Sequence, residues 1–92
     1  MKHLDFSQTI PVVIRNRSGI LFQEDIKALT SLNNKGVFDI LPLHENFISI
    51  IKDYIVMYRK NGETKEMKIT EGVLEVYQDK ISIFLEIFSK AF

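Results

Sequence analysis

Short apolar runs alternate with polar residues along most of this chain, and turn-forming residues interrupt them at close intervals. The clearest alternation covers residues 81–87, where every second residue is isoleucine or leucine, and this period of two is typical of a half-buried strand. Closely spaced turns between short β-branched and aromatic runs are typical of small sandwiches and barrels. We therefore predict an all-β fold, a small sandwich or flattened barrel of about eight to ten short strands.

Four turn signals divide the chain, and Asn61-Gly62 is the strongest of them. It separates residues 54–60 from residues 63–69, and both of its residues tolerate the positive φ angles of a two-residue type I′ turn. These two segments are therefore predicted to pair as an antiparallel hairpin. The other turn signals are Asn16 to Gly19, Asn33 to Gly36, and Gln78-Asp79.

Two segments also fit the spacing of an amphipathic helix. Apolar residues recur at helical intervals in residues 47–58 and again in residues 81–88. Isoleucine, valine and aromatic residues dominate the first segment, and such residues lose rotamer freedom in helices but pack well in sheets. We predict mainly strand for both segments. Residues 23–29 have the propensity for a short helix, and there we predict a strand with that helix as the alternative.

The chain has 92 residues, of which 46% are hydrophobic and 26% charged, and this composition predicts one globular domain over residues 1–92. The 12 Lys and Arg residues balance the 12 Asp and Glu residues, so the charge does not indicate nucleic acid or an anionic membrane as a partner. The absence of cysteine excludes disulfides and thiolate metal sites. Because no apolar run approaches the length of a signal-peptide core or a membrane span, we expect a soluble intracellular protein.

Few residues suggest catalysis or metal binding. The two histidines, His3 and His44, are far apart in sequence, and a metal site would need Asp39 or Glu45 as further ligands. The four glycines are isolated, which excludes a phosphate-binding glycine loop, and no serine lies in a nucleophile-elbow pattern. We expect a non-enzymatic domain without a metal or cofactor. An enzyme that uses His44 with Asp39 or Glu45 is the catalytic alternative.

Residues 36–49 form the most distinctive stretch of the sequence. Gly36 closes a turn, residues 37–41 make a short and mainly apolar strand, and Pro42 ends ladder pairing because it has no N–H. Residues 44–46 then form a polar corner before Phe47 begins the next apolar strand. Taken by itself, the stretch is a strand, a corner and a second strand.

This stretch resembles part of the N-terminal β-sandwich domain of the epsilon subunit of F-type ATP synthases, which is called delta in mitochondria. The family pattern there is Gly-acidic-apolar-Gly-Ile-Leu-Pro-Gly-His-Ala-Pro. A second family block, with Ser-Gly-Gly before Leu-Glu-Val, is similar to residues 70–76; the family's final strand is similar to residues 79–85, and its first hairpin to residues 12–22. Order and spacing agree over about residues 10–87, and the first pattern is matched at Gly36, Phe38, Ile40, Leu41, Pro42 and His44.

The resemblance implies a non-catalytic subunit of the central stalk that couples the gamma shaft to the ring of c subunits. It implies that residues 33–37 approach the ring and residues 42–47 approach the shaft, with the complex at the cytoplasmic face of the cell membrane. Apolar side chains on such surfaces suit a permanent interface, so at least two among Val37, Leu43 and the rings of Phe38 or Phe47 should be partly exposed. The implied contact residues are Asn34, Gly36, Val37, Phe38, Asp39, Pro42, Leu43, His44 and Phe47.

The chain departs from the family pattern at three places. Val37 replaces an acidic residue that faces the ring in the family, and Leu43 and Glu71 replace glycines. The chain also ends at Phe92, before the C-terminal helical hairpin that binds ATP or inhibits hydrolysis in some relatives, so we expect no nucleotide binding. These departures keep an alternative open, a free-standing β-sandwich interaction module that has diverged from the synthase.

Overall fold

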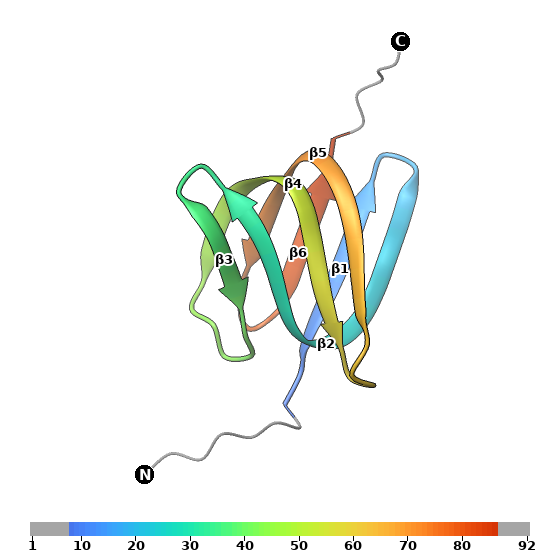
Figure 1. The fold of residues 1–92 in the computed structure, drawn as a ribbon, viewed down its shortest axis with the longest axis vertical. Helices are drawn as coiled ribbons and strands as arrows, with labels where there is room; N and C mark the ends of the chain where they lie inside the picture. The colour runs from blue at the N-terminus through green and yellow to red at the C-terminus, as the bar shows by residue number, and fades with distance from the viewer. Residues whose placement is uncertain (1–7, 87–92) are drawn as a thin grey trace.

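Six β-strands and no helix make up residues 8–86, the part of the chain that the computed structural model describes (Figure 1). The predicted all-β class is confirmed. This part of the chain contains no helix that could span a membrane. The strands are β1 (Ile10–Asn16), β2 (Gly19–Asn33), β3 (Gly36–Ile40), β4 (Phe47–Arg59), β5 (Thr64–Val76) and β6 (Ile81–Leu85).

Five of the strands close into a barrel, and the remaining one extends it at an edge. The sheet order is β1-β6-β5-β4-β2-β3, and an additional pairing between β1 and β2 closes the ring. β1 and β6 pair in parallel, and the other pairings between described strands are antiparallel. Among these strands β3 pairs with β2 alone, so it lies outside the closed ring (Figure 1).

The strands are fewer and longer than the sequence predicted. β2 has 15 residues, and β4 and β5 have 13 each. β-Bulges bend β2 and β5 without ending them. The registers leave extra residues at Leu21 and Lys27 in β2 and at Thr70 in β5. Each extra residue interrupts the alternation of inward and outward side chains, and an interrupted alternation resembles a strand end in the sequence.

Residues 23–29, for which a short helix was the alternative on propensity, lie in β2 and contain one of these bulges. Ile26 and Leu29 are fully buried and three residues apart, as on one face of a helix, but they lie on either side of this bulge. The strand prediction is confirmed there, in residues 47–58 of β4 and in residues 81–85 of β6. Ile87 and Phe88, which contributed to the last pattern, lie outside the described residues.

Isoleucine and leucine side chains from all six strands fill the inside of the barrel. One polar side chain is fully buried with them: the Ser31 hydroxyl donates a hydrogen bond of 2.7 Å to the carbonyl oxygen of Tyr54, so its burial leaves no unpaired group. The largest fully buried side chains are Ile10, Ile14, Ile26, Leu29, Ile40, Ile51, Ile55, Met57, Leu74, Ile81, Ile83 and Val12.

The predicted hairpin between β4 and β5 is present, but its turn is of another type. The N–H of Gly62 donates to the carbonyl of Arg59 at 3.0 Å, and the N–H of Arg59 donates to the carbonyl of Glu63 at 2.8 Å. Gly62 has a φ of 91°, and Asn61 does not share this positive φ. Residues 60–62 therefore form a three-residue loop, and the prediction of a two-residue type I′ turn at Asn61-Gly62 is wrong. Asn61 instead accepts a hydrogen bond from the N–H of Glu63 through its side chain, at 2.9 Å.

The geometry of a type I′ turn occurs between β5 and β6. Gln78 and Asp79 have φ angles of 49° and 60°, and Tyr77 and Lys80 exchange backbone hydrogen bonds of 3.0 and 3.2 Å across them. Neither turn residue is glycine, so this turn carries backbone strain that an Asn-Gly pair would have avoided.

Replacing Gly62 by valine should lower the free energy of unfolding by about 1 kcal/mol or more. No atom lies within 4 Å of a Cβ placed on Gly62, so the loss comes from its φ of 91° and not from a clash. Urea unfolding of the two proteins measures the difference. Gly62→Asn is the matched control and should lose less, because asparagine tolerates left-handed backbone. Equal stability of the Val and Asn variants would contradict the explanation.

Candidate protein interface

The predicted contact residues lie in β3, in the segments that join its two ends to β2 and β4, and at the first residue of β4. Figure 1 shows where these strands lie. The β2–β3 turn at one end holds Asn34 and leads into Gly36 and Val37, and the side-chain oxygen of Asn33 fixes it by accepting from the N–H of Lys35 at 2.8 Å. Residues 41–46, which we call the corner, follow the other end of β3 and lead into β4. A strand of five residues spans about 17 Å, so the two regions are far enough apart to contact different partners.

Each end of β3 presents strongly exposed apolar side chains: Val37 at one end, and Leu41 and Leu43 at the other. The exposed fraction is 63% for Val37 and 72% for Leu43, while Phe38 and Phe47 are partly buried against the barrel core. The predicted exposure of at least two of these four side chains is confirmed. Their contacts with a partner stay a prediction.

Leu43 occupies a turn position that normally takes glycine. The N–H of His44 donates to the carbonyl of Leu41 at 3.2 Å, which closes a four-residue turn with Pro42 second and Leu43 third. Leu43 has a φ of 70°, as the third residue of a type II turn requires. A leucine in this conformation is unusual, because left-handed backbone crowds its Cβ. The chain thus places an apolar side chain in solvent on a strained backbone.

The β5–β6 turn holds this corner in place, and the sequence did not predict that contact. The N–H of Leu43 donates to Oδ1 of Asp79 at 2.6 Å, and the N–H of Gln78 donates to Oδ1 of Asn46 at 3.0 Å. The bonded residues are 36 and 32 positions apart in sequence, respectively. Each of the two segments has the composition of an ordinary turn, so no local pattern could reveal that they are hydrogen-bonded to each other.

His44 packs within the corner. Its ring meets the ring of Phe47 edge-on at a centroid distance of 5.7 Å, and Phe47 meets Phe38 at 5.5 Å. Nδ1 of His44 lies 2.7 Å from the carbonyl oxygen of Glu45 and must carry the proton, since a carbonyl only accepts. These contacts make His44 part of the support of the corner.

Asp39 follows Phe38 in β3, so its side chain points to the opposite face of the strand. Its Oδ1 accepts a hydrogen bond of 2.6 Å from the hydroxyl of Thr30, which also lies 3.3 Å from the hydroxyl of Tyr58. The hydrogen bonds of residues 8–86 therefore join neither Asp39 nor the Glu45 carboxylate to the ring of His44. Within that range no group of three or more His, Asp or Glu side chains could hold a metal ion, and His3 lies outside it.

The family model described as "ATP synthase, Delta/Epsilon chain, beta-sandwich domain" matches residues 9–91. The chain belongs to this family. The ATP synthase epsilon chain of Elusimicrobium minutum is 34% identical over 86 residues, which are 91% of this chain and 58% of that protein. That of Citrifermentans bemidjiense is 30% identical over 71 residues, which are 77% of this chain and 51% of that protein. The chain thus spans about half the length of the curated relatives it matches.

Two solved assemblies contain chains with the same fold. One is the mitochondrial ATP synthase of Euglena gracilis, described as OSCP/F1/c-ring, with a TM-score of 0.77 and 21% identity over 91% of this chain and 54% of that one. The other is the central stalk and c-ring of the Tetrahymena thermophila enzyme, with a TM-score of 0.73 and 16% identity over 89% of this chain and 66% of that one. At these identities the likeness shows the delta/epsilon fold alone.

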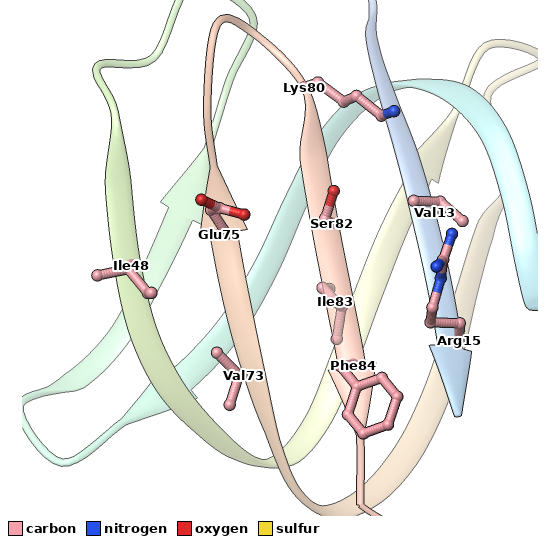
Figure 2. Close-up of a pocket in the computed structure, with 9 residues that line it drawn as sticks. All are labelled: Val13, Arg15, Ile48, Val73, Glu75, Lys80, Ser82, Ile83 and Phe84. Carbon is pink, nitrogen blue, oxygen red and sulfur yellow. The ribbon is translucent and has the colours of Figure 1, made fainter. Parts of the chain in front are cut away.

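This delta/epsilon domain has a second apolar surface, which the sequence-based prediction missed. Ile48, Ile50, Val73 and Phe84 are exposed on the outside of β4, β5 and β6, and we call them the outer-face patch. The registers place Val73 opposite both Ile50 and Phe84. Figure 2 shows Ile48, Val73 and Phe84 of this surface beside Glu75 and Lys80. These five side chains are among those that line a hollow of about 380 Å³. In β4, apolar residues occupy both even-numbered and odd-numbered positions, so both faces of the strand carry them. This pattern is the signal that could have revealed the outer-face patch.

Proposed function

We propose that this chain is a non-catalytic central-stalk subunit, the epsilon subunit, of an F-type ATP synthase that translocates protons or sodium ions. In this role it couples the gamma shaft to the c-ring. The observation that carries the proposal is the exposure of the apolar side chains Val37 and Leu43 at opposite ends of one short strand. Membership of the delta/epsilon family and relatives named ATP synthase epsilon chain support the proposal.

The ring-facing region is residues 33–37 and the shaft-facing region is residues 42–47. The first presents Val37 from a hydrogen-bonded turn, and the second presents Leu43 from a corner tied to the β5–β6 turn. The first region also includes or is supported by Asn34, Gly36 and Phe38. The second region also includes or is supported by Pro42, His44 and Phe47. Asp39 lies between the two regions. Within the complex the chain lies at the cytoplasmic face of the membrane and acts as one domain.

Torque transfer requires that the two regions keep their separation under load. β3 joins them directly and pairs with β2 over five residue pairs, from Leu29↔Ile40 to Asn33↔Gly36. β2 in turn belongs to the closed barrel. Bending β3 would therefore break ladder hydrogen bonds as well as core packing, which makes the domain a stiff spacer.

Affinity purification of the tagged full chain from native membranes tests the proposal. We expect the gamma and c subunits to co-purify, and purified gamma to bind the chain directly. Leu43→Asp is the control and should capture much less gamma, whereas Val37→Asp restores the acidic residue of the family pattern and should capture both subunits like the parent. Capture of other proteins without gamma would instead support the free-standing interaction module and overturn the proposal.

A further inference from the structure

The corner that holds Leu43 and the β5–β6 turn stabilise each other through reciprocal hydrogen bonds. Asp79 supplies the acceptor for the backbone N–H of Leu43 at 2.6 Å, and Asn46 supplies the acceptor for the backbone N–H of Gln78 at 3.0 Å. In each bond the side chain of one turn satisfies a backbone donor of the other. Bonds to a carboxylate are shorter and stronger than neutral ones, so the bond from Leu43 to Asp79 should dominate.

Backbone strain is concentrated in the same two turns. Leu43, Gln78 and Asp79 have φ angles of 70°, 49° and 60°, which are three of the four positive values at non-glycine residues in the described chain. Strained conformations of this kind persist only where the surroundings enforce them. The hydrogen bond from Leu43 to Asp79 is such an enforcing contact.

The strained conformation does not serve the isolated domain. Leu43 is 72% exposed, so its side chain gains almost nothing from burial, and glycine would form the same turn without strain. Leu41 and Tyr77 are also exposed, one at the start of the corner and one at the start of the β5–β6 turn. The interlocked turns therefore display apolar side chains on a backbone that is ordered before any partner arrives.

We propose that Asp79 is a positioning residue for partner binding. Its carboxylate holds Leu43 in the left-handed conformation and so fixes the direction in which the leucine side chain enters an apolar pocket of the gamma subunit. This inference rests on the proposed function. A side chain ordered in advance loses less conformational entropy on association, so the bond raises affinity without Asp79 touching the partner.

The first test measures the affinity of the full chain for purified gamma subunit with Asp79 replaced. Asp79→Ala removes the acceptor and should weaken binding roughly tenfold, because the left-handed conformation of Leu43 that enters the pocket becomes less populated in the free chain. Asp79→Asn keeps an Oδ1 acceptor and tolerates positive φ, so it should bind within about twofold of the parent. Thermal melts and exchange of the Leu43 amide hydrogen accompany both variants, and the amide should lose protection in the Ala variant alone.

A double-mutant cycle with Leu43→Gly separates positioning from direct contact. In the Leu43→Gly background there is no side chain to orient, so Asp79→Ala should cause no further loss of affinity. An equal loss in both backgrounds would show that Asp79 acts directly or through general damage, and would overturn the inference. So would an Asp79→Ala variant that binds like the parent. A parent chain that fails to bind gamma would instead overturn the proposed function, and the inference with it.

Discussion

Gly72→Val should lower the free energy of unfolding by about 3 kcal/mol, the largest stability effect we expect from a single substitution in this chain. A Cβ at Gly72 would lie 2.7 Å from Cδ2 of Leu85 and 3.0 Å from the carbonyl oxygen of Phe84. The Leu85 side chain can move, but the Phe84 carbonyl is backbone of β6 and cannot move alone. Since β6 also pairs with β1, displacing it disturbs the closure of the barrel.

Urea unfolding of the purified chain measures this loss, and Gly72→Ala should fall between parent and valine variant. Lys68→Val is the matched control, because it puts the same side chain on an exposed position of β5 and should change stability by less than about 0.5 kcal/mol. If Gly72→Val is as stable as Lys68→Val, β5 and β6 do not approach each other as closely as the structure shows.

Leu43→Asp should weaken binding to the gamma subunit by roughly a hundredfold without lowering the melting temperature, and this is the largest binding effect we expect. The side chain is 72% exposed in the domain, so the substitution removes no internal packing. Aspartate also tolerates the φ of 70° better than leucine does. In the complex, by contrast, an apolar pocket would bury a carboxylate that has no partner there.

Val37→Asp is the matched control for this binding experiment. It introduces the same charge at an exposed apolar residue, but at the opposite end of β3. Its affinity for gamma should therefore equal that of the parent. Parent-like binding by Leu43→Asp would contradict the shaft-facing role, and unfolding of that variant would show that Leu43 supports the fold.

Features that depend on neighbouring residues could be predicted from the sequence. The alternation of apolar residues and the choice of β-branched side chains specified strands, and Asn, Asp and Gly placed the four turns. The order of short motifs identified the family, and the resemblance to it indicated that Val37 and Leu43 are exposed. The strands and turns follow from local conformational preference or from the pattern of one strand, and the family follows from the order of motifs along the chain.

Pairing between distant segments was decided only by the tertiary structure. The bulges at Lys27 and Thr70 follow from how β2 and β5 fit their neighbours, and three of the six strands are longer than the short strands expected from the sequence. The closed barrel also imposed type I′ geometry on the turn at Gln78 and Asp79, although neither residue is glycine. It brought the side chain of Asp79 to the N–H of Leu43, which is 36 positions away in sequence. Register and long-range hydrogen bonds depend on the free energy of the whole packed barrel, so no local window of the sequence contains them.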